Sequence, residues 1–146
     1  MIELTDASLF REQAFVSGTW MDADSGKRFD VVNPASGKTL GSVPDMGRDE
    51  VGRTIDAAEA ALYLWRKETA RERAIFLRRW HDLMMENQED LARIMTAEQG
   101  KPLAESRGEI AYAASFIEWF AEEAKRIYGD VIPSPSADSR ILTRSE

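Results

Sequence analysis

Few residues of this chain could take part in chemistry, and most of them have a simpler structural explanation. The sequence contains no Cys and a single His, so it offers no thiolate nucleophile, no disulfide and no Cys-based metal site. The single histidine, His81, lies beside Trp80 with Asp82 and Glu86 nearby. A lone His without converging ligands is usually a helix-surface or boundary residue, so we expect such a role for His81 in preference to metal binding or acid–base work.

Two further groups of residues match functional motifs only in part. Ser36–Thr39 reads Ser-Gly-Lys-Thr, like the end of a phosphate-binding loop, but Val32 stands where that pattern requires a Gly. A plain turn explains the stretch better. The carboxylates of Glu118, Glu122 and Glu123 could suggest an acid–base pair, yet their positions on a helix favour solvated surface charges.

An aromatic stripe formed by Tyr112, Phe116 and Trp119 has helical spacing, i, i+4, i+7. It runs beside a second apolar stripe, and together they cover more than half of a helix that we expect to run from Pro102 to Gly129, with a kink near Gly108. A helix that is apolar over so much of its surface needs neighbours on two sides. The aromatic stripe is therefore either a core contact with a further domain or the wall of a pocket.

The elements before this helix divide into a β part and a helical part. Three candidate strands, Phe15–Trp20, Arg28–Asn33 and Lys38–Val43, are separated by turn residues and predict a small antiparallel sheet. From about Arg48 the apolar period becomes helical.

Three helices are expected between Arg48 and Gly100. The first should bury a stripe of Val51, Ile55, Ala58, Leu62 and Trp65. The second begins at a capping box of Thr69 and Glu72, and its apolar face holds Phe76, Leu77, Trp80, Leu83 and Met84. The third has Asn87 as its N-cap and ends at Gly100, before Pro102.

Composition sets the class of protein. A 43% apolar and 31% charged sequence of 146 residues is typical of one globular domain. The net charge of −7 disfavours nucleic acid and anionic membranes as partners. The N-terminal residues do not resemble a secretory signal, and no apolar run is long enough to span a bilayer. We therefore expect a cytoplasmic protein.

The C-terminal residues indicate a sequence that continues. Ile132–Asp138 reads as a linker, and Arg140–Arg144 reads as a strand that has no partner within the chain. An unpaired terminal strand is an aggregation hazard unless another segment or subunit pairs with it.

Several motifs in register resemble the aldehyde dehydrogenase family. Two motifs are the most specific for this family: Glu98–Leu103 (Glu-Gln-Gly-Lys-Pro-Leu) and Phe116–Ala124 (Phe-Ile-Glu-Trp-Phe-Ala-Glu-Glu-Ala). Gly18–Trp20, Val32–Gly37 and Ile141–Arg144 fit the same family in the same order. The resemblance extends from Phe15 to the C-terminus, and its details are most similar to succinate-semialdehyde dehydrogenases.

The resemblance implies an enzyme that oxidises an aldehyde to a carboxylate and transfers hydride to NAD or NADP. In that family a Cys thiolate attacks the carbonyl, an amide and a backbone N–H hold the oxyanion, and a Glu activates water. These residues and the dinucleotide loop would all lie beyond this chain. No catalytic or cofactor-binding residue is therefore expected here, and the chain alone should be inactive.

The resemblance also divides the chain and assigns roles to four of its residues. It implies an α/β parent fold, in which this chain is mostly α with a small N-terminal antiparallel β element and a C-terminal arm strand. Residues 1–131 would begin the cofactor-binding domain, and residues 132–146 would start an arm that pairs with another subunit in a dimer or tetramer. Val32, through its carbonyl, and Glu98 would help to hold a monovalent cation, and Tyr112 and Phe116 would line the aldehyde tunnel. The alternatives are another aldehyde dehydrogenase subfamily and a non-catalytic helical interaction module.

Overall fold

The computed structural model describes residues 2–144 and is mostly helical, as predicted. A short 3₁₀ turn, η1 (Ala7–Leu9), precedes two antiparallel hairpins, β1 (Ala14–Val16) with β2 (Thr19–Met21) and β3 (Arg28–Val32) with β4 (Thr39–Pro44). Four helices follow: α1 (Arg48–Trp65), α2 (Ala70–Glu86), α3 (Gln88–Gln99) and α4 (Leu103–Glu123). A short ribbon of β5 (Val131–Ile132) and β6 (Ile141–Leu142) follows α4. Among the described residues, no helix is both long and apolar enough to cross a membrane.

The first hairpin corrects the prediction of a single strand over Phe15–Trp20. The chain reverses at Ser17 and Gly18, whose φ angles are 50° and 80°, so Phe15 lies opposite Trp20. Two consecutive positive φ angles are typical of the tightest hairpin turns, in which Gly or Asn is the usual residue. Because Ser is at the first position, the sequence did not indicate this turn. The Phe15 and Trp20 rings contact each other across the hairpin, with centroids 5.0 Å apart.

The second hairpin follows the prediction closely and has a well-formed turn at Asn33–Lys38. The Asn33 side-chain oxygen accepts hydrogen bonds from the N–H groups of Ala35 and Ser36, and Gly37 has a φ of 69°. This confirms the interpretation of Ser36–Thr39 as part of a turn and the start of a strand. The two hairpins are separate pairs and do not form the single small sheet that was expected.

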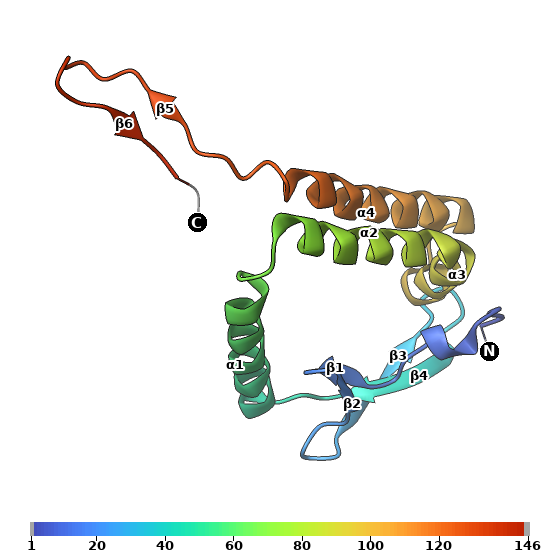
Figure 1. Ribbon diagram of the computed structural model, residues 1–146. Coiled ribbons are helices and arrows are strands. Elements are labelled where there is room, and N and C mark those ends of the chain that lie inside the picture. The colour runs from blue at the N-terminus through green and yellow to red at the C-terminus, as the bar shows by residue number, and fades with distance from the viewer. Residues whose placement is uncertain (1, 145–146) are drawn as a thin grey trace.

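Helix α1 does not bury its predicted stripe. Val51, Ile55 and Leu62 are all at least half exposed. Figure 1 shows the reason: α1 stands apart from the layer of α2, α3 and α4 and runs in a different direction. The prediction of a buried face was therefore wrong for this chain, although the helix itself and its amphipathic pattern are correct.

Helix α2 begins where predicted but turns an unexpected face inward. The Thr69 hydroxyl accepts a hydrogen bond from the Glu72 N–H, and the Glu72 carboxylate accepts one from the Thr69 N–H, which confirms the capping box. Of the predicted apolar face, Leu77 and Met84 are half-buried, whereas Phe76 and Trp80 are more than half exposed. The buried residue of α2 is the small Ala74, because α2 packs closely along α4.

Helices α3 and α4 supply most of the buried residues. Asn87 is the N-cap residue of α3 and Gly100, with a φ of 77°, is its C-cap residue, both as predicted. The Asn87 side chain makes no capping hydrogen bond to α3 and donates to the Leu83 carbonyl of α2. Helix α4 ends at Glu123, earlier than the predicted Gly129, and is continuous through Gly108, where a kink was expected. The buried side chains of these two helices are mostly small: Asp90, Ala92, Ser106, Ile110, Ala114 and Ala121.

The C-terminal ribbon corrects the prediction of an unpaired strand. Val131 pairs with Leu142 and Ile132 with Ile141, so the predicted strand has a partner just before the proline-containing linker. Figure 1 shows this ribbon extending away from the helical layer. Val131 and Leu142 are 75% and 71% exposed. Residue 1 of the predicted N-terminal unit and residues 145 and 146 of the predicted arm lie outside the described residues.

Candidate functional site

The aromatic stripe of α4 forms an exposed face on the helix. Tyr112 and Phe116 are stacked edge to face, with ring centroids 4.8 Å apart, and the Ser115 hydroxyl donates to the Tyr112 carbonyl. Tyr112, Phe116 and Trp119 are 65%, 47% and 63% exposed. One side of α4 thus packs within the chain while its aromatic side has no cover among the described residues. This is the two-sided helix that the sequence predicted, with the two candidate tunnel residues brought together.

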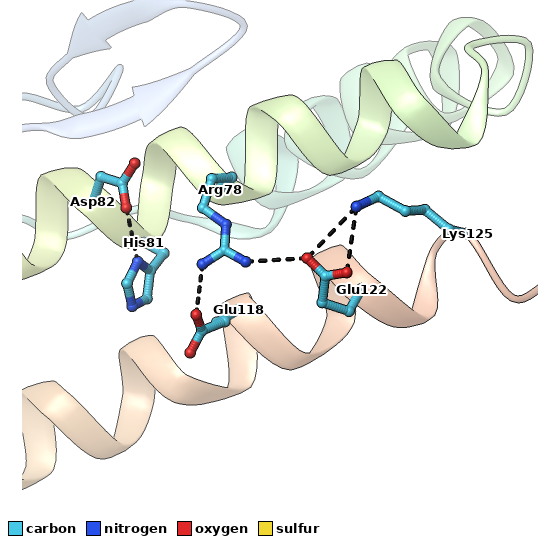
Figure 2. Close-up of polar contacts among 6 residues, drawn as sticks. All are labelled: Arg78, His81, Asp82, Glu118, Glu122 and Lys125. Atoms are coloured by element: carbon cyan, nitrogen blue, oxygen red, sulfur yellow. Dashed lines mark hydrogen bonds and ion pairs between the residues drawn. The ribbon is translucent and has the colours of Figure 1, made fainter.

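Helix α4 also contacts α2 through a cluster of charged side chains (Figure 2). The Arg78 guanidinium of α2 donates one hydrogen bond to Glu118, at 2.5 Å, and one to Glu122, at 3.1 Å. Lys125 contacts Glu122 from the other side. These carboxylates remain partly exposed, as expected of surface charges on a helix. Two of the three also form an interhelical ion-pair cluster, and the third, Glu123, pairs with Arg126.

The charges in this cluster shift one another's protonation equilibria. Lys125 and, next, Arg78 lower the pKa of Glu122, because each donates hydrogen bonds to its carboxylate. The two carboxylates raise the pKa of Arg78. Both shifts favour the charged forms of Glu122 and Arg78, as expected of an ion pair.

His81 lies at the edge of the same cluster, as a boundary residue. Its Nδ1 is 3.0 Å from the Asp82 carboxylate, and its side chain is 20% exposed. Figure 2 shows its ring directed toward α4. The sequence-based expectation of a helix-boundary position is confirmed.

The two candidate cation ligands belong to segments that the fold brings close together. Val32 ends β3, and the turn that follows packs on the end of α3: a Cβ added at Gly100 would lie 2.9 Å from Cγ of Pro34. Glu98 lies in the last turn of α3 and is exposed. The neighbours of both residues, including Asn33 and Ala97, line one groove of about 440 Å³.

The donor set at this location is partial. A carbonyl and a carboxylate are suitable oxygen ligands for a hard cation, and the C-terminal end of a helix favours positive charge. Among residues 2–144, however, no three His, Cys, Asp or Glu side chains converge as a metal site. Val32 and Glu98 would therefore be two ligands of a shell that other groups complete.

The sequence did not indicate the structural roles of two buried carboxylates, Asp90 and Glu50. Asp90, at the start of α3, is buried and accepts hydrogen bonds from the N–H groups of Asp6 and Thr5, which lower its pKa. Glu50 is buried near the start of α1 and accepts hydrogen bonds from Asp24 and Gly47, which lower its pKa. Acidic residues are common in the first turn of a helix, so their positions gave no signal of these longer-range contacts.

Comparison with known proteins places these features in a family. Residues 20–146 match the aldehyde dehydrogenase family. The chain is 62% identical to a glutarate-semialdehyde dehydrogenase of Pseudomonas putida and 62% identical to an NADP⁺ succinate-semialdehyde dehydrogenase of Escherichia coli, in each case over 97% of this chain. A crystal structure described as an E. coli NADP-dependent enzyme superposes with a TM-score of 0.92 at 63% identity over 96% of the chain.

The chain spans about 29% of the length of each of these relatives. The matched residues include the Glu98–Leu103 motif, helix α4 with its aromatic face, and the turn that follows β3. With a family match over most of the sequence and a shared fold at this level of identity, the chain belongs to the aldehyde dehydrogenase family.

Proposed function

We propose that this chain forms the N-terminal part of an NAD(P)-dependent aldehyde dehydrogenase that oxidises a short semialdehyde, with succinate semialdehyde as the preferred substrate. The observation that carries the proposal is the sequence identity to semialdehyde dehydrogenases, which is above 60% over almost the whole chain. Residues 1–131 would begin the cofactor-binding domain, and residues 132–146 would begin the oligomerisation arm. The protein would act in the cytoplasm.

The chemistry itself is assigned to residues outside this chain. The sequence has no Cys to attack the aldehyde and no G-x-G-x-x-G loop to hold a dinucleotide. NAD or NADP would accept the hydride when bound, but no residue of this chain is assigned to hold it. The contribution of this chain is structural: the exposed Tyr112 and Phe116 pair would form part of the wall along which the aldehyde enters.

The substrate proposal is tested by steady-state kinetics on the protein as its gene encodes it. We expect kcat/KM for succinate semialdehyde to exceed that for glutarate semialdehyde and for butanal, which lacks the distal carboxylate. Running each aldehyde with NAD and with NADP assigns the cofactor in the same experiment. Faster turnover of glutarate semialdehyde would reassign the substrate within the family, and turnover of neither semialdehyde would refute the proposal.

A structural monovalent cation at Val32 and Glu98 is part of the same proposal. Its support is the packing of the β3–β4 turn on the end of α3 together with the oxygen chemistry of the two groups. K⁺ should then raise the melting temperature of the protein, and Glu98→Gln should remove most of that rise. An equal response to K⁺ in both proteins would exclude Glu98 as a ligand.

A further inference from the structure

Helices α2 and α4 pack along each other, and most of the residues that they bury are small. Helix α2 buries Ala74, and helix α4 buries Ile110, Ala114, Ala121 and Ser106, of which Ser106 contacts Thr96 of α3. Small side chains let two helices approach closely, but they present shallow ridges and grooves. The small buried residues therefore contribute little to fixing the axial position of one helix on the other.

Arg78 makes a position-specific polar contact between the two helices. Its guanidinium reaches across from α2 and binds Glu118 and Glu122, which lie one helical turn apart on α4. The rigid fork of an arginine can bind two carboxylates at once only when both are at the correct height. A shift of α4 by one turn would break one of the two hydrogen bonds.

The clamp and the candidate tunnel wall are parts of the same rigid helix. Glu118 follows Phe116 by two residues, and helix α4 is continuous from Leu103 to Glu123. Phe116 and Tyr112 are exposed, whereas Glu118 contacts α2. Any translation or rotation of α4 permitted at the clamp would therefore move the aromatic pair by a similar amount.

We infer that Arg78 is a positioning residue for the aldehyde site: it fixes the register of α4 on α2 and so sets the position of the Tyr112–Phe116 wall. The inference rests on the proposed function for its catalytic consequence. Its structural part, the register of the two helices, does not depend on activity. Exposed ion pairs contribute little to global stability, so the role assigned to Arg78 is specification of position, with little effect on the free energy of unfolding.

The test compares Arg78→Met with Arg79→Met in the protein as its gene encodes it. Arg79 is a matched control because it is the next residue of the same helix and its ion pair, with Glu86, stays within α2. For Arg78→Met, KM for the semialdehyde should rise roughly two- to thirty-fold, the range of couplings transmitted between packed elements. KM for the dinucleotide should not change, and Arg79→Met should behave like the parent protein.

Two further variants separate positioning from a general loss of folded enzyme. Phe116→Ala removes the wall itself and should raise the same KM, whereas loss of folded protein would lower the apparent kcat and leave KM unchanged. Arg78→Lys keeps the positive charge but lacks the rigid fork of arginine, so it should rescue KM in part. Adding Glu118→Gln and Glu122→Gln to Arg78→Met should cause little further change, because the contact is already lost.

Hydrogen exchange gives a readout that does not require activity. Amides over residues 103–123 should exchange faster in Arg78→Met than in Arg79→Met. Equal exchange and equal KM in the two variants would overturn the inference. If the parent protein oxidises no aldehyde, the proposed function fails, but the exchange comparison still decides whether Arg78 holds α4.

Discussion

Glu89 is the residue whose charge is most strongly tied to the fold. Its carboxylate binds Arg107 of α4 and Arg93 of its own helix. Arg107 first, and then Arg93, lower the pKa of Glu89 to about 2. Because the folded-state pKa is below the unfolded one, the stabilisation is complete above the unfolded value, near 4.5, and is lost as the pH falls toward 2.

Glu89→Gln should therefore lower the melting temperature at pH 7 by a small amount, because the Arg107 and Glu89 side chains are 45% and 43% exposed to screening solvent. The difference from the parent protein should shrink as the pH falls below 5. Calorimetry at several pH values measures this directly. Glu86→Gln is a suitable control, because Glu86 pairs only with Arg79 on its own helix and has no α4 contact among the ion pairs of the described residues. A difference that stays constant with pH would show that the Glu89 carboxylate is not the stabilising group.

At the residue scale, sequence reasoning succeeded where the interaction was local. The Thr69–Glu72 capping box and the left-handed Gly100 involve residues close together in the chain, so their motifs contain the whole interaction. It failed for Arg78, whose partners are 40 and 44 residues away. A periodicity analysis places a charged residue on the polar side of a helix and carries no information about which distant charge it will contact.

At the scale of elements, the C-terminal ribbon is the part of the chain with the least internal support. Its two strands pair only with each other, and Val131 and Leu142 are exposed apolar residues directly opposite one another. A two-stranded ribbon is marginally stable alone in water. Its exposed edges and apolar pair are the features that another copy of the protein would cover.

Val131→Asp together with Leu142→Asp should accordingly lower the oligomeric state of the protein, since two buried carboxylates at a subunit contact would be costly. Light scattering coupled to size-exclusion chromatography measures the mass in solution. Asp138→Ala, in the connection between the two strands, is a control with no change to the apolar pair. An unchanged mass for the double variant would exclude the ribbon as the oligomer contact.

Element boundaries were predicted well where turn chemistry was standard. The β3–β4 hairpin has Asn and Gly at the positions that require them, and its strands were placed within one residue. The β1–β2 hairpin has Ser17 at a positive φ, so its turn was read as the middle of a strand. For α1 the helix was correct and the buried face was not, because periodicity shows which face is apolar and does not show whether this chain contains its cover.

At the scale of the whole molecule, the exposed surface is too large for the mass. The accessible surface is 10910 Å² for 16.5 kDa. A compact monomer of that mass exposes about 7,500 Å². Large apolar side chains contribute to this additional surface. Those more than half exposed come from three different helices and include Ile55, Leu62, Phe76, Trp80, Tyr112 and Trp119. Exposed apolar side chains in this number are typical of surfaces that another domain or subunit covers.

These surfaces predict different behaviour for residues 1–146 alone and for the same residues within the longer protein that we propose. Alone, the polypeptide should bind a hydrophobic dye such as ANS and associate as its concentration rises, because its helices have one covered side at most. Within the longer protein the exposed faces of α1, α2 and α4 should be covered, so dye binding should be weak and Trp80 and Trp119 should be protected from acrylamide quenching. An isolated polypeptide that remains monomeric, binds no dye and unfolds cooperatively would mean that these apolar faces need no cover, and that the helical layer is stable through its own small, tightly packed seam.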